Sequence, residues 1–190
     1  MSRGAFLVRG ALATGAVVGA ASVSPWVGSA LAQGKGGDID ILNFALTLEY
    51  LEADFYKQAG KLSLKGQYKS LAKDFGANEQ EHVDALKATI GQLGGKAVKS
   101  PTFSFPMKSQ KDFVKLAITL EDTGVSAYNG AAPMIESKDV LAAAGSIVQV
   151  EARHAAALRF LDGMDPTRGA FDKTLAKGAV LKAVKPLIKA

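Results

Sequence analysis

Glu79-Gln80-Glu81-His82 and Glu151-Ala152-Arg153-His154 are the two stretches that decide the fold of this 190-residue chain. Both read Glu-x-x-His, and together they contain both of its histidines. Residues three apart on a helix share a face, so each stretch presents a carboxylate beside an imidazole. One such motif in a helical protein means little, because Glu is common. Finding every histidine of the chain in this arrangement indicates a functional pattern.

The two stretches belong to an internal repeat with a period of 72 residues (151 − 79). The same shift lays residues 45–49 (Ala-Leu-Thr-Leu-Glu) on residues 117–121 (Ala-Ile-Thr-Leu-Glu), and Tyr56 on Tyr128. In each copy, a Glu precedes the Glu of Glu-x-x-His by 30 residues (79 − 49 and 151 − 121). The chain therefore reads as two copies of a helical hairpin, each contributing Glu and then Glu-x-x-His.

Hydrophobic periodicity and helix-end signals predict four helices of twenty-odd residues. Their caps are Asp38 or Asp40, then, for the third and fourth helices, Ser109 and Ser137. No stretch alternates as a strand would, and the proline-containing residues 96–108 form a longer connection. The prediction is all-α, a four-helix bundle, with helices at about residues 38–60, 67–95, 109–133 and 137–163.

Two such hairpins facing each other would place four carboxylates and two imidazoles at one level of the bundle core. Four ionised glutamates there would carry a charge of −4, which two divalent cations would balance. Oxygen and imidazole ligands suit iron or manganese better than copper(I) or structural zinc. The alternative is solvated faces or structural salt bridges. We predict two metal ions, held by Glu49, Glu79, His82, Glu121, Glu151 and His154.

This ligand pattern resembles the ferritin-like superfamily, and more narrowly its exported, desiccation-related branch, from about Asp38 to Gly163. The resemblance implies two iron ions, with manganese as the alternative, and oxidation of Fe(II) or a reaction with O2 or peroxide. Ferroxidases, peroxide-reducing proteins and manganese catalases share such ligands, so the reaction stays open. A non-catalytic metal-binding or desiccation and stress-protection protein is the second reading. A metal-free interaction module would leave the repeat unexplained.

Three further residues bear on the site. Tyr56 and Tyr128 each follow a predicted ligand by two helical turns and should point at the same seam. They are candidates to hydrogen-bond the centre or relay electrons, or are ordinary core tyrosines. Glu52 lies one turn beyond Glu49, but its repeat counterpart is Gly124. We therefore expect Glu52 on a solvated face rather than among the ligands.

Composition excludes several classes. The chain has no cysteine, which rules out disulfide frameworks, thiolate metal sites and cysteine nucleophiles. It is 48% hydrophobic and 22% charged, which suits a packed core. Its net charge of +5 includes Arg3 and Arg9 of the N-terminal segment, and no aromatic-basic motif for nucleic acid is found.

Both ends of the chain carry their own signals. Residues 1–32 have a positive start, a short apolar run and the A-x-A site Ala30-Leu31-Ala32, and predict a Tat-like or Sec signal peptide. We therefore expect an exported protein, periplasmic or extracellular, without a stable membrane span. Residues 33–165 would form the bundle, and residues 166–190 a basic amphipathic tail. This tail would pack back on the bundle, serve as an interaction tail or touch anionic membrane. A homodimer is left open.

Overall fold

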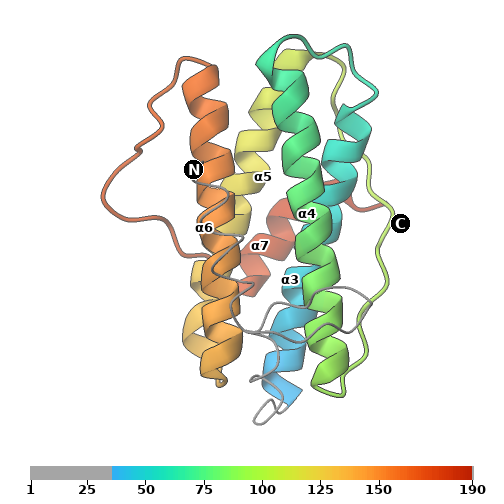
Figure 1. Cartoon of the computed structure of the whole chain (residues 1–190), viewed down its shortest axis with the longest axis vertical. Helices are drawn as coiled ribbons and strands as arrows, with labels where there is room; N and C mark the ends of the chain where they lie inside the picture. The colour runs from blue at the N-terminus through green and yellow to red at the C-terminus, as the bar shows by residue number, and fades with distance from the viewer. Residues whose placement is uncertain (1–35, 190) are drawn as a thin grey trace, which may run out of the picture.

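The computed structural model describes residues 36–189, so the predicted signal segment 1–32 lies outside the described residues. Four long helices form a bundle (Figure 1), and a short helix and two 3-10 turns accompany them. The part of the chain that the structure describes contains one isolated β-bridge, Phe103 to Ile188, and no sheet. The all-α prediction is confirmed. The elements are α3 (Gly36–Ala59), α4 (Gln67–Gln92), α5 (Gln110–Ala131), η1 (Ala132–Met134), α6 (Lys138–Leu161), α7 (Lys177–Val184) and η2 (Lys185–Leu187).

Two of the predicted caps are present. Ser109 precedes α5 with an extended backbone, and its Oγ accepts from the backbone N–H of Asp112 at 3.2 Å. The same hydroxyl donates to the Asp112 carboxylate at 2.8 Å, which closes a small capping ring. Ser137 caps α6 in the same way by accepting from the N–H of Val140 at 3.3 Å. Each cap satisfies a backbone donor that has no partner within its helix.

The predicted cap at Asp38 is wrong. Helix α3 begins before it, at Gly36, and the Asp38 side chain is buried. Its carboxylate instead accepts from the backbone N–H groups of Glu136 and Ser137, both at 2.9 Å. Buried N–H groups require acceptors, and the loop between α5 and α6 brings two of them to the start of α3. Asp38 therefore ties one hairpin to the other.

The four long helices form two hairpins, α3 packed along α4 and α5 packed along α6. The connection between α4 and α5 runs the length of the bundle, so α5 begins at the end where α3 finishes (Figure 1). The two hairpins therefore lie head to tail. In this arrangement, repeat-equivalent residues meet only at mid-bundle, and those further out lie at opposite ends.

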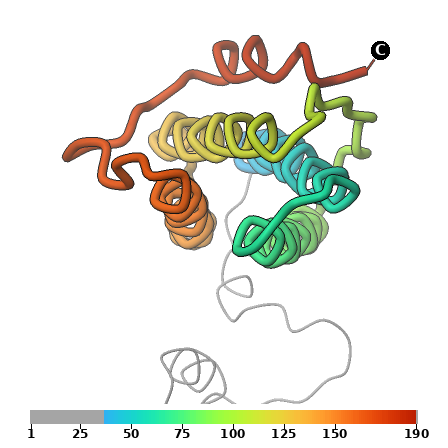
Figure 2. Tube along the Cα trace, turned by 90° about the horizontal axis from the view of Figure 1, so that it is seen from above, coloured from blue at the N-terminus to red at the C-terminus, as the bar shows by residue number. Residues whose placement is uncertain are grey.

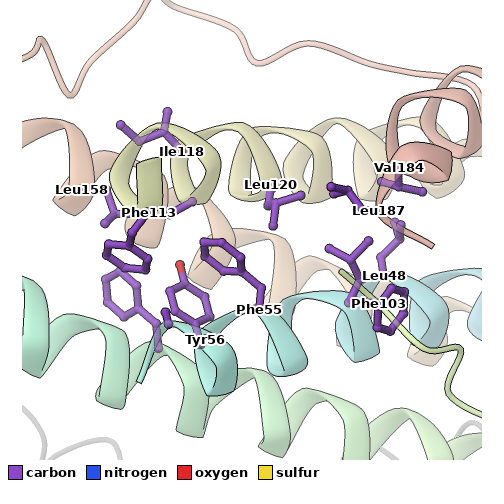
Figure 3. Close-up of a cluster of buried hydrophobic side chains, with 14 of the residues drawn as sticks. Leu48, Phe55, Tyr56, Phe103, Phe113, Ile118, Leu120, Leu158, Val184 and Leu187 are labelled. Atoms are coloured by element: carbon purple, nitrogen blue, oxygen red, sulfur yellow. The ribbon is translucent and has the colours of Figure 1, made fainter. Parts of the chain in front are cut away.

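Two apolar clusters fill the core. Phe55, Tyr56 and Phe113 belong to the first, and Figure 3 shows them beside one another. Leu42, Ile90, Val140 and Ile147 belong to the second. Burying each such side chain stabilises the fold by roughly 1.5–3 kcal/mol.

The C-terminal segment packs on the bundle. Figure 2 shows it crossing the face formed by α3 and α5, and Val180 and Val184 of α7 are buried. Further along, Ser104 N–H donates to the Leu187 carbonyl at 2.8 Å. A Cβ at Gly130 of α5 would lie 1.9 Å from the carbonyl oxygen of Leu175, so this close approach requires glycine.

Within residues 36–189, none of the helices combines the length and the apolar character that a membrane crossing needs.

Candidate metal centre

The six predicted residues meet in the middle of the bundle. Glu49 comes from α3, Glu121 from α5, and the two Glu-x-x-His motifs from α4 and α6. The four glutamates have 0% relative exposure, and His154 has 3%. The His82 side chain is 12% exposed. Because the hairpins lie head to tail, the glutamates of all four helices reach the same level of the core.

His82 points its Nδ1 at three carboxylates. This nitrogen lies 2.9 Å from Glu79 Oε2, and 3.1 Å from both Glu49 Oε2 and Glu151 Oε1. A single N–H can donate well to only one of these oxygens. The remaining oxygen lone pairs converge on one point, which is the geometry of a cation site.

Residues outside the carboxylate cluster also contact His154. Its Nδ1 lies 2.9 Å from Glu79 Oε1 and 3.3 Å from Glu121 Oε2. Its Nε2 lies 3.0 Å from the side-chain amide of Asn78. The ring stacks on Phe75 with 3.8 Å between centroids. Asn78 and Phe75 therefore fix the imidazole with Nδ1 directed into the cluster.

Potential ligand atoms form two groups, and within each group they all lie within 4.8 Å of one another. The two groups share Glu79 and Glu151. The arrangement thus offers two candidate cation positions that have two carboxylates in common. One group consists of Glu49, Glu79, His82 and Glu151, and the other of Glu79, Glu121, Glu151 and His154.

The two predicted tyrosines cross between the hairpins. Tyr128 of α5 donates its hydroxyl to Glu49 Oε1 of α3 at 2.6 Å. Tyr56 of α3 donates reciprocally to Glu121 Oε1 of α5. Each hydroxyl holds one carboxylate oxygen, which leaves the other oxygen free to face the cluster.

The expectation that Glu52 lies on a solvated face is wrong, although it belongs to neither ligand group. Its side chain is buried, with 2% relative exposure, and its Oε2 has no hydrogen-bond partner among the described residues. The reason lies on the opposite helix. A Cβ at Gly124 would be 3.3 Å from Glu52 Oε1 and 3.7 Å from Glu151 Cγ. The missing side chain of Gly124 makes room for Glu52 next to Glu151, so the core holds a fifth glutamate.

Burial and crowding raise the pKa of most of these carboxyl groups. Burial, and next the nearby charge of Glu151, raises the pKa of Glu49 to about 8. Burial is likewise the largest cause that raises the pKa of Glu52, Glu121 and Glu151, and neighbouring carboxylates add to it. Crowded like charges in a low dielectric produce this pattern.

The pKa values of His82 and Glu79 shift in the direction that favours the charged form of each side chain. Burial opposes it, but hydrogen bonds with Glu151, Glu49 and Glu79 raise the pKa of His82 to about 12. Burial also opposes ionisation of Glu79, yet its hydrogen bonds with His154 and His82 lower its pKa to about 2. The cluster thus uses its own imidazole as a partial counter-ion.

Sequence reasoning missed three residues of this centre, namely Glu52, Asn78 and Phe75. Only Glu52 could have been noticed in the sequence, because its repeat counterpart is Gly124, and glycine has no side chain to compete for the space. Asn78 and Phe75 have Val150 and Ile147 as counterparts, and the repeat gave no reason to select them.

The fold and the site together define a class: four-helix bundles whose core holds paired Glu and Glu-x-x-His ligand sets from two repeated hairpins. A family model described as ferritin-like domain matches residues 37–163. The chain belongs to this ferritin-like family.

Several solved structures share the fold. A conserved hypothetical protein from Mycobacterium tuberculosis is 20% identical with a TM-score of 0.61, covering 68% of this chain and 99% of that one. A structure described as ferritin-like, diiron-carboxylate proteins from Bacillus anthracis is 19% identical with a TM-score of 0.59, covering 73% and 98%. A comparison with curated proteins found no match.

Proposed function

We propose that the chain is an exported protein that holds two metal ions, iron or manganese, and that it oxidises Fe(II) or reacts with dioxygen or peroxide. The observation that carries the proposal is the pair of ligand groups that share Glu79 and Glu151. A single cation would leave one imidazole and one terminal carboxylate unused. Two cations would use all six residues.

The donors fit such ions. Both oxygens of Glu151, Glu79 Oε1, Glu121 Oε2 and His154 Nδ1 are buried, and among the described residues the short imidazole–carboxylate contacts do not give them hydrogen bonds of good geometry. Buried polar atoms of this kind are costly unless something binds them. The donors are all oxygen and imidazole nitrogen, which suits iron or manganese. Two divalent ions would also offset the repulsion that raises the pKa of these carboxyl groups.

Each residue of the chain has a distinct part. Glu79 and Glu151 belong to both ligand groups and would help to hold both ions, whereas Glu49 and Glu121 each belong to one group and would hold one ion. Tyr128 and Tyr56 orient these last two carboxylates through their hydroxyl hydrogen bonds. Complete burial of the four glutamates keeps bulk water away. A bound metal pair would supply the redox chemistry that no side chain of this site provides.

Other parts of the proposal rest on separate grounds. Export is supported by the signal-like features of residues 1–32. Iron is supported by the similarity to the Bacillus anthracis structure, which is described as diiron-carboxylate. Stress protection without catalysis is the second candidate function, because ligands and fold do not select a reaction.

Metal analysis of protein purified from its native compartment tests the proposal, followed by oxygen and peroxide consumption after loading with Fe(II) or Mn(II). We expect two ions per chain and faster consumption than the free metal gives. The matched variants are His82→Ala and His154→Ala, which should each lower both quantities. Two ions per chain without consumption would favour the stress-protection function. Metal-free protein that also resists loading would refute both.

A further inference from the structure

A cavity of about 110 Å³ lies between α3, α4, α5 and α6, at the end of the bundle where α3 and α6 begin (Figure 1). Its wall is mostly aliphatic, with Leu42, Leu48 and Val140 among the lining residues. It is separate from the six residues of the metal centre, none of which lines it.

The polar side chains of the wall already have partners. Thr89 Oγ1 donates to the Ala85 carbonyl at 2.8 Å, and Ser146 Oγ donates to the Ala143 carbonyl at 2.7 Å. The Tyr128 hydroxyl donates to Glu49. A water molecule needs two to four polar partners to be held in a cavity, and this wall offers few free ones. The space therefore favours an apolar occupant.

The repeat explains why the space exists. Near the other end of the bundle, Tyr56 packs against three phenylalanines: Phe55 at 5.1 Å, Phe75 at 5.9 Å and Phe113 at 6.1 Å between ring centroids. Figure 3 shows Phe55 and Phe113 on Tyr56. These rings fill the space around the first tyrosine of the repeat.

The repeat places no phenylalanine at the three corresponding positions around the second tyrosine, Tyr128. Under the 72-residue shift, the counterparts of the three phenylalanines are Ala127, Ile147 and Ile41. All three line the cavity, and so does Tyr128 itself. The cavity thus lies at the positions where the other half of the molecule has three aromatic rings.

The cavity connects the surface with the neighbourhood of the metal centre. Ala85 of α4 and Ser146 of α6 belong to its wall and are exposed, so its mouth lies between these two helices. Its inner wall includes Tyr128, whose hydroxyl is 2.6 Å from Glu49. A molecule in the cavity would therefore touch Tyr128, which is hydrogen-bonded to Glu49 of the metal centre.

We propose that this cavity binds a small apolar molecule of the size of xenon or dioxygen against the ring of Tyr128. An apolar cavity of about 150 Å³ in another protein stays dry and binds xenon or benzene, so the volume is sufficient. That dioxygen is the natural occupant rests on the proposed function. The affinity for an apolar probe does not, because it needs no metal.

The test is xenon binding to the metal-free full-length protein, followed through methyl NMR shifts. Xenon should shift the methyl signals of Ile41 and Ile147. Ala127→Phe restores a ring that the other half of the repeat has, and it should abolish these shifts. Ile147→Phe is a second filling variant, in case the first does not fold. The matched control, Phe55→Ala, should keep the site and open another beside Tyr56.

Absence of xenon shifts at Ile41 and Ile147 in the folded wild-type protein would overturn the proposal, as would binding that survives both filling variants. The role of dioxygen is tested separately on metal-loaded protein. A filling variant that keeps its metal content should consume dioxygen more slowly. Unchanged consumption would remove dioxygen as the occupant. If metal-loaded wild-type protein consumed neither dioxygen nor peroxide while the metal-free protein still bound xenon, only the proposed function would be contradicted.

Discussion

Raising the pH from about 5 to about 8 should destabilise the metal-free protein, the reverse of ordinary acid denaturation. Glu49 is the main reason, because burial and the charge of Glu151 raise its pKa from 4.5 to about 8 in the folded state. A carboxyl group whose pKa rises on folding binds a proton that the unfolded chain has lost. Its stabilisation is complete below pH 4.5 and declines as the pH rises to about 8.

The magnitude follows from the two pKa values. Each pH unit of difference corresponds to about 1.36 kcal/mol, so Glu49 alone accounts for roughly 5 kcal/mol between them. His82 acts in the same direction, because its pKa rises from 6.5 to about 12 and its stabilisation declines above pH 6.5. Glu79 has the opposite effect at low pH. Folding lowers its pKa from 4.5 to about 2, so the stabilisation that it provides is lost as the pH falls through that range. The metal-free protein should therefore be most stable at about pH 4.5.

Metal-loaded protein should show the opposite slope. Protons compete with cations for Glu and His, so binding tightens as the pH rises, and tighter binding stabilises the fold. The assay is denaturant unfolding at several pH values, once with chelator and once with Mn(II). The two curves should diverge as the pH rises.

The matched control is Glu49→Gln, which cannot ionise but keeps an oxygen that can accept from Tyr128. It should flatten the pH dependence of the metal-free protein and make it more stable than the wild type at about pH 8. If the free energy of unfolding of metal-free wild-type protein stayed constant or increased from about pH 5 to 8, the crowded-carboxylate explanation would be refuted.

Three other substitutions follow from single contacts. Glu52→Gln removes a buried, unpaired carboxylate, so the metal-free protein should gain about 1–3 kcal/mol in unfolding titrations at about pH 8; a loss would show that Glu52 is stabilising. Asn78→Val should lower metal affinity by about 10–100-fold in calorimetry because it frees one imidazole, whereas Val150→Asn at the repeat-equivalent position should not lower it. Gly130→Ala forces a Cβ against the C-terminal segment and should cost about 1–3 kcal/mol with faster proteolysis of that segment. Gly145→Ala, inside α6, has open space around its Cβ and should instead stabilise the protein by about 0.5–1 kcal/mol.

The helices and the six cluster residues could be predicted because their signals are local or repeated. Capping by Ser109 and Ser137 depends on residues three positions away, so the sequence contains the whole interaction. The spacing of Glu-x-x-His fixes a common helix face in the same way. The 72-residue repeat then relates the two hairpins, and the structure brings all six residues together. The metal itself remains a prediction.

The errors concern residues whose surroundings come from another helix. Asp38 lies where a helix cap is expected, but the loop before α6 supplies it with two buried backbone donors. Glu52 is expected on a solvated face because its repeat counterpart is Gly124, but the missing side chain of Gly124 makes room for it in the core. Burial of a charged group depends on the volume left by its neighbours in space, and local periodicity does not report that volume.

By itself, then, the sequence determined an all-α bundle of two repeated hairpins and the residues that share its central seam. Only the tertiary structure decided that Tyr56 and Tyr128 each donate a hydrogen bond to a glutamate of the opposite hairpin. It also decided that a cavity lies beside Tyr128. The physical reason is the head-to-tail packing of the hairpins. It brings equivalent residues together at mid-bundle and sends the rest to opposite ends. There, rings fill the space around one tyrosine, and smaller side chains leave space around the other.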